Sequence, residues 1–258
     1  MTPGAALSFS IRDWFAWKPG HETRASWLPA ASATLPAPAA EPDWAIKTAA
    51  ALPMMLRRRL SEFGQKVVGS ALALPAAKHA RYVFASRYGE FTTTVRILED
   101  LHKGTLPSPT DFSLSVHHAL AGLLSIQTGN KAGHTTVSAG RDTFGYGLLE
   151  AVAFCAEQPD QSALLVAYDE PLPDIYHPFR SADEAGLPLV VALEIVADLP
   201  AATRYQMEMH PGTMPAAPGP AVTSPLSESA LNFFLSDRAE ASLSGDTMNW
   251  ILRRVTSH

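Results

Sequence analysis

Thiols and long apolar runs are scarce in this chain of 258 residues. Cys155 is the only cysteine, so no internal disulfide can form, and the lack of a C-x-x-C pair excludes a thiolate zinc site. No apolar run reaches the ~18 residues that a membrane-spanning helix needs. The N-terminus also lacks the charged, apolar and small-residue order of a signal peptide. We therefore expect a cytoplasmic protein with no membrane partner.

Basic charge is scarce as well. The formal net charge is -5 and the pI is near 6.0. The arginines at 57–59 form the only tight basic cluster, which we interpret as the start of a solvated helix face. This balance gives no electrostatic reason to expect nucleic acid as a partner. With 47% hydrophobic and 17% charged residues, the chain can bury a substantial core.

Hydrophobic periodicity predicts alternating strands and helices, which is typical of an α/β layered fold. Strands are expected at 7–17, 80–86, 162–167 and 187–197. Helices are expected at 53–72, at 90–102, from Asp111 or Ser113 as cap to Gly129, and at 143–155. The Ala, Pro and Ser composition of 26–42 predicts an extended surface loop.

The last 60 or so residues give a weaker pattern. Pro, Gly and Ala at 207–224 predict a loop, and 227–234 and 247–255 have the pattern of short helices. We therefore divide the chain into a domain at 1–198 and a loop-rich extension with short helices at 199–258. The extension is expected to pack on the same domain or on a partner.

The stretch 111–156 predicts a helix, a short strand, a sharp turn and a second helix. Such a turn exposes a side chain and aims backbone N–H groups at one spot, which suits an anion or a covalent acyl intermediate. The turn, residues 138–143, reads Ser-Ala-Gly-Arg-Asp-Thr and holds no cysteine. We call it the elbow. From the residues alone, Asp142 is expected as the N-cap of the second helix, with its carboxylate accepting N–H bonds.

This pattern resembles the N-terminal half of a β-ketoacyl synthase, over roughly residues 9–193. Residues 116–122 are similar to the synthase helix motif V-x-N-x-x-A-G, with His118 where Asn is usual. Counting back three residues from Gly145, as in the synthase pattern, puts the catalytic cysteine position at Asp142. A gap of one residue would put it at Arg141 instead. Neither side chain can replace a thiolate nucleophile.

The resemblance implies a truncated thiolase-like fold, essentially the N-terminal half with a mixed central sheet flanked by helices. A complete synthase has a second half that supplies two catalytic histidines. After Leu193 this chain has only His210 and His258, and neither lies in a synthase-like motif. The resemblance therefore implies no catalytic residue, no metal and no cofactor in this chain.

Within the family, the chain resembles a short chain-length factor of type II aryl polyene or polyketide-like biosynthesis. That resemblance implies a heterodimer in which a ketosynthase subunit carries out the condensation on acyl carrier protein substrates. This chain would shape the acyl tunnel, and carrier protein would meet the complex through the partner. Arg141 or Asp142, at the vacated position, would shape a subunit interface, where a buried charge must be paired.

Tunnel or interface candidates are bulky side chains near the expected helix and the elbow. They are Phe112, Val116, His118, Leu120, Phe144 and Tyr146. Simple core packing is the alternative for each. His117 and His118 are adjacent and point to different helix faces, which argues against a metal site.

Two other functions stay open. The chain could be an acyl-thioester hydrolase or acyltransferase that uses Ser138 or Asp142, although no G-x-S-x-G elbow is present. It could also be a homodimeric protein that binds acyl chains or acyl carrier protein. Cys155, at the far end of an apolar helix, is expected to be a buried core thiol.

Overall fold

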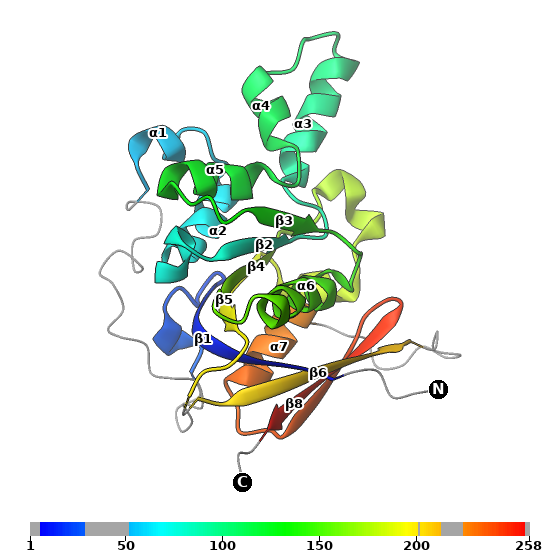
Figure 1. Cartoon of the computed structure of the whole chain (residues 1–258). Helices are drawn as coiled ribbons and strands as arrows, with labels where there is room; N and C mark the ends of the chain where they lie inside the picture. The colour runs from blue at the N-terminus through cyan, green and yellow to red at the C-terminus, as the bar shows by residue number, and fades with distance from the viewer. Residues whose placement is uncertain (1–5, 29–51, 201, 213–223, 256–258) are drawn as a thin grey trace.

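The computed structural model describes residues 6–28, 52–200, 202–212 and 224–255. Its centre is one mixed sheet of eight strands in the order β3-β2-β4-β5-β1-β6-β8-β7 (Figure 1). The strands are β1 Leu7–Trp17, β2 Arg81–Ala85, β3 His134–Val137, β4 Ala163–Asp169, β5 Leu189–Val196, β6 Arg204–Pro211, β7 Glu240–Ser244 and β8 Met248–Val255. The helices are α1 Met54–Arg57, α2 Glu62–Leu72, α3 Phe91–His102, α4 Pro109–Leu114, α5 Ala119–Thr128, α6 Thr143–Glu157 and α7 Leu226–Phe234.

Strand direction divides the sheet into two parts. β3, β2 and β4 are parallel, whereas every pairing from β4–β5 to β8–β7 is antiparallel. All of β5, and β4 from Ala163 to Tyr168, are buried. Their apolar runs match strands that are covered on both faces.

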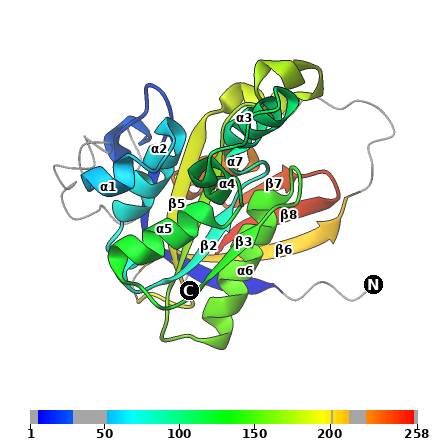
Figure 2. The same ribbon diagram turned by 90° about the horizontal axis from the view of Figure 1, so that it is seen from above.

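Each face of the sheet has its own core. α6 and α7 pack on one face, and α2 and α5 pack on the other (Figures 1 and 2). β1 contributes to both, with Phe9 and Trp14 on the α6 side and Phe15 on the α2 side. Strict alternation would put residues 9 and 14 on opposite faces. A register shift between Ile11 and Asp13 inserts one extra residue and brings Trp14 back to the face of Phe9.

Most predicted elements are confirmed to within a few residues. The four expected strands are β1, β2, β4 and β5, and the helices at 90–102, 143–155 and 227–234 are α3, α6 and α7. Gly129 ends α5 with φ 67°, a left-handed conformation that suits glycine, as predicted. Most of the loop expected at 26–42 lies outside the described residues.

Two predicted helices are each broken in two. The helix at 53–72 is α1 plus α2, because Ser61 caps a new start by accepting the N–H of Gly64 at 2.7 Å. The exposed arginines at 57–59 lie at this break. The helix expected from Asp111 or Ser113 to Gly129 is α4 plus α5, and Ser108 caps α4. His117 and His118 lie in the break rather than on a helix.

Two C-terminal predictions are wrong where the structure describes them: the start of the predicted loop and the second predicted short helix are both strands. Residues 204–211 form β6, which includes the first residues of the loop predicted at 207–224. Residues 213–223 of that loop lie outside the described residues. The helix expected at 247–255 is β8, and β7 was not predicted. These three strands continue the same sheet, so 199–258 is not the loop-rich extension expected. That residues 1–198 form a domain of their own stays a prediction.

Candidate functional site

The elbow joins the end of β3 to the start of α6. Gly140 adopts φ 56°, which lets the chain reverse direction in the space of a few residues. The Thr143 hydroxyl accepts the N–H of Ala139 at 2.9 Å and donates to the carbonyl of Gly140 at 2.6 Å. The predicted strand-turn-helix geometry is therefore present and is held by its own side chains.

Asp142 lies at the N-cap position of α6, but its carboxylate makes no bond to that helix. The side chain is 1% exposed and is directed into the β7–β8 hairpin, residues 240–255. Oδ2 accepts the N–H of Asp246 at 3.0 Å and, from Thr247, the N–H at 2.8 Å and the hydroxyl at 2.9 Å. Oδ1 accepts the indole N–H of Trp250 at 2.9 Å. The expected side-chain cap of α6 is therefore absent, and the carboxylate accepts its N–H bonds from the hairpin instead; these bonds offset the cost of burying it.

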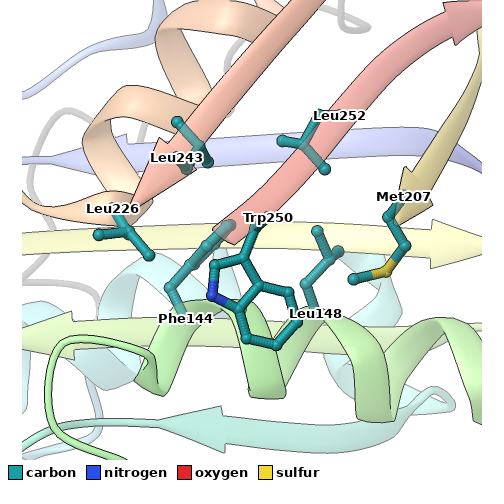
Figure 3. Close-up of a pocket in the computed structure, with 8 residues that line it drawn as sticks. Phe144, Leu148, Met207, Leu226, Leu243, Trp250 and Leu252 are labelled. Atoms are coloured by element: carbon teal, nitrogen blue, oxygen red, sulfur yellow. The ribbon is translucent and has the colours of Figure 1, made fainter. Parts of the chain in front are cut away.

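Two glycines allow this close approach. A Cβ added at Gly245 would lie 1.7 Å from Asp142 Oδ1, and one at Gly145 would lie 2.1 Å from Trp250 Cε2. The Trp250 ring also meets Tyr146 edge to face, with centroids 5.0 Å apart. Figure 3 shows the indole against α6 among apolar neighbours. The residues around it are Phe144, Leu148, Met207, Leu226, Leu243 and Leu252.

Arg141 is paired within the chain rather than with Asp142. Its N–H donates to Asp246 Oδ2 at 2.9 Å, and its guanidinium lies 3.8 Å from both Asp183 and Asp246. Arg87 binds Asp183 more tightly, at 2.6 Å. Burial alone would raise the pKa of Asp183, but the bonds from Arg87 and Ser181 and the two guanidinium charges hold this pKa below its usual value. The charge of Arg141 is therefore compensated within the chain.

Neither Ser138 nor the lone thiol, Cys155, lies in a setting that would make it a nucleophile. The exposed Ser138 donates its hydroxyl to the carbonyl of Arg87 at 2.9 Å, and in the part of the chain that is described no histidine contacts it. Cys155 is fully buried, as predicted, with Sγ 3.3 Å from the carbonyl oxygen of Ile195. Burial raises the pKa of this thiol to about 11, which leaves it protonated and unreactive at neutral pH.

The structure separates the predicted tunnel or interface residues into three groups. Leu120 is buried in the α2–α5 core, while Phe144 and Tyr146 contribute to the opposite core. Val116 and His118 line an open groove of about 180 Å³ between α4 and α5. Its other lining residues are Arg59, Ser113, Leu114, Ala119, Gly122, Leu123 and Ile126. Phe112, on α4, is 64% exposed.

Sequence reasoning missed every hairpin residue that binds Asp142. A signal was present, because Gly245-Asp246 is a typical hairpin turn pair. It is flanked by the alternating apolar pairs Ala241 and Leu243, and Trp250 and Leu252. Among the described residues, no group of three or more His, Cys, Asp or Glu side chains could hold a metal ion. Nor, over the same residues, does any helix have the length and apolarity to cross a membrane.

The mixed sheet and the elbow that leads into a buried helix are the features that the resemblance to a ketosynthase N-terminal half implied. The model of the β-ketoacyl synthase N-terminal domain matches residues 25–252, and the chain belongs to this family. The match extends well beyond residue 193, where the recognised resemblance ended. No curated protein matches the sequence significantly.

Three solved structures are similar to this chain over most of its length. A chain from the complex of the ketosynthase ApeO with its chain length factor ApeC, from Xenorhabdus doucetiae, is 28% identical with a TM-score of 0.76, covering 96% of this chain and 100% of that one. A chain from the ishigamide ketosynthase/chain length factor is 13% identical with a TM-score of 0.69, covering 96% and 99%. A β-ketoacyl synthase from Burkholderia phymatum STM815 is 12% identical with a TM-score of 0.54, covering 82% of this chain and 65% of that one. The last two show the fold alone. The predicted truncated thiolase-like fold is confirmed.

Proposed function

We propose that this chain is a non-catalytic chain-length factor that pairs with an active ketosynthase in the cytoplasm and shapes its acyl tunnel. The partner would elongate a polyene or fatty-acid-like chain on acyl carrier protein. One observation carries the proposal: the likeness to a chain of a ketosynthase–chain length factor complex extends over that chain's whole length.

The chemistry of the elbow supports a non-catalytic role. We assign the vacated nucleophile position to Asp142 rather than Arg141, because Asp142 immediately precedes α6 and its side chain is enclosed. A carboxylate held by four hydrogen bonds is a weak nucleophile, and none of its donors is a histidine that could move a proton.

The surface near β3 supports a partner subunit. Among the described residues β3 pairs only with β2, so its outer edge has free backbone groups. Its sequence, His-Thr-Thr-Val, lacks the Lys, Glu or Pro that often protect an edge strand. The short helices at this end of the sheet carry exposed apolar side chains (Figure 1). They are Met54 and Met55 near α1, Leu98 and Leu101 on α3, Phe112 on α4, and Ile126 on α5.

So many exposed apolar groups at one end of a protein mark an interaction site. We propose that the groove between α4 and α5 is the part of this surface that meets the acyl tunnel, with Val116 and His118 in its wall. Phe112 would lie at its rim. Leu120, Phe144 and Tyr146 are better explained by core packing, because each contacts one of the two cores.

Co-expression with an active ketosynthase tests the pairing. We expect a stable 1:1 complex that elongates acyl carrier protein substrates, whereas the purified chain alone should not turn over acyl thioesters. Ile126→Asp, at a side chain that is 77% exposed, should abolish the complex, and Met209→Asp on β6 is the matched control at an exposed apolar site. Turnover of acyl thioesters by the chain alone would instead support the hydrolase or acyltransferase.

The tunnel assignment has its own readout. Val116→Trp should fill the groove and shorten the product made by the complex, while the complex itself still forms. Met209→Trp serves as control. Unchanged product length in the Val116 variant would remove the groove from the tunnel wall, and a stable homodimer that binds acyl chains without a ketosynthase would favour the binding-protein alternative.

A further inference from the structure

We infer that the β7–β8 hairpin is a built-in closure of the elbow. In this view the Asp142 carboxylate clamps the turn at 245–247, and the Trp250 indole covers the first turn of α6. The inference goes beyond the proposed function, which needs only the loss of a nucleophile. A closed elbow also excludes a pantetheine-linked acyl group from this chain, so that substrate could enter only from a partner's side.

The hydrogen bonds are arranged as a clamp rather than as a helix cap. All four donors to Asp142 come from three hairpin residues, Asp246, Thr247 and Trp250, and α6 supplies none of them. A second hydrogen bond has the opposite direction: the N–H of Arg141, on the elbow, donates to the side chain of Asp246, on the hairpin. Elbow and hairpin thus each donate to a carboxylate of the other, across about 100 residues of sequence.

The shapes of the two segments match as closely as their polar groups do. Gly140 and Gly145 on the elbow side, and Gly245 on the hairpin side, all lie where a Cβ would meet the opposite segment closer than 3.0 Å. Trp250 is 1% exposed, and its indole lies so close to Gly145 that a Cβ there would be 2.1 Å from Cε2. An acyl group at the position of residue 142 would have to displace this indole.

The clamp makes a chemical prediction that simple packing does not. In Asp142→Asn, one carboxylate oxygen becomes an amide NH₂ group of almost the same size. Whichever way the amide turns, its NH₂ group faces a donor, either the Trp250 indole or the N–H groups at 246 and 247. Trp250→Phe removes the indole donor, so the double variant can turn its NH₂ group toward the phenyl ring and keep its oxygen on the turn.

Hydrogen exchange on the isolated chain tests the clamp. In Asp142→Asn, the amides of 245–250 should exchange about 10- to 100-fold faster than in the wild type, the loss expected for a bond to a charged acceptor. In the double variant with Trp250→Phe they should exchange more slowly than the product of the two single effects predicts. Amides of β4 report global unfolding, so an equal increase there would overturn a local clamp.

Alkylation tests the closure itself. Leu148→Cys places a thiol beneath Trp250, and Ser138→Cys places one on the exposed part of the same elbow. Iodoacetamide should modify the 148 site at least about 100-fold more slowly than the 138 site, and adding Asp142→Asn should accelerate only the former. Equal rates with the clamp intact would refute the closure. Neither experiment needs a ketosynthase, so a failure here leaves the pairing proposal standing, and a failure to pair leaves the closure standing.

Discussion

Adding one methyl group at Gly145 should expel Trp250 from its site. The Cβ of Gly145→Ala would lie 2.1 Å from Cε2, 2.4 Å from Cδ2 and 2.6 Å from Cζ2 of the indole. All three are ring atoms of one rigid group, so no rotation of a flexible side chain relieves the contact. Either α6 shifts away from β8, or the indole leaves a site where it is 1% exposed.

The loss of folding free energy in Gly145→Ala depends on which of these two responses occurs. Over-packing with backbone shifts costs about 1–3 kcal/mol, and full loss of a buried tryptophan costs about 3–5 kcal/mol. Alanine in place of glycine inside a helix returns about 0.5–1 kcal/mol. We therefore expect the free energy of unfolding to fall by about 0–2.5 kcal/mol if α6 shifts and by about 2–4.5 kcal/mol if the indole leaves. The second response would lower the melting temperature of a chain this size by about 4–18 °C.

Gly122→Ala on α5 is the matched control, because a Cβ there meets nothing within 4 Å. It should stabilise the chain by about 0.5–1 kcal/mol through helix propensity alone. Thermal and urea unfolding of both variants, followed by circular dichroism, make the comparison. If Gly145→Ala proves as stable as Gly122→Ala, the indole does not lie on Gly145 and the account of the elbow is wrong.

Three further predictions concern buried polar groups. Cys155, whose pKa burial raises to about 11, should react with a thiol reagent at pH 8 only after the chain is unfolded. Arg87→Ala removes the closest cation from the buried Asp183 and leaves it only the more distant Arg141, so it should cost about 3 kcal/mol in unfolding assays, whereas Arg96→Ala, in an exposed pair, should cost less than about 1 kcal/mol. Burial raises the pKa of Asp169 to about 7 despite the nearby Arg87 charge, so the folded state holds this proton more tightly than the unfolded state does. The wild type should therefore lose stability relative to Asp169→Asn as pH rises from about 4 to 7, and a flat difference would contradict this.

The parallel half of the sheet could be predicted from sequence because its strands are short apolar runs separated by helices. In β4, residues from Ala163 to Tyr168 are all buried, so a simple run of apolar letters was enough. The elbow was predictable for a similar reason, since a strand, a run of small residues and an apolar helix follow one another directly. These signals are local.

The hairpin could not be found in the same way because β8 mixes its signals. Trp250 and Leu252 face the core, but Arg253 and Arg254 follow, and Arg253 pairs with Glu208 on β6. That partner is 45 residues away. Local sequence patterns do not identify such a strand, because its partners are distant in the sequence and its polar face is charged.

The site residues illustrate the same limit. The place of Asp142 at the start of α6 could be predicted from the sequence, but the direction of its carboxylate depends on donors about 104 residues further on. His118 was placed on a helix because the apolar spacing continues through it. The break after α4 instead leaves it at the cap of α5, where its ring stacks near His134.

Asp142 and the hairpin depend on each other, and this predicts the effect of placing a cysteine at position 142. A cysteine at this position would offer one weak acceptor to four donors, leaving buried N–H groups unpaired at a cost of about 1–3 kcal/mol each. Conversely, a carboxylate at a helix start without the hairpin would gain nothing from Trp250 or Thr247. Asp142→Cys alone should therefore destabilise the fold rather than create a synthase-like site, because the donors that bind Asp142 belong to the hairpin.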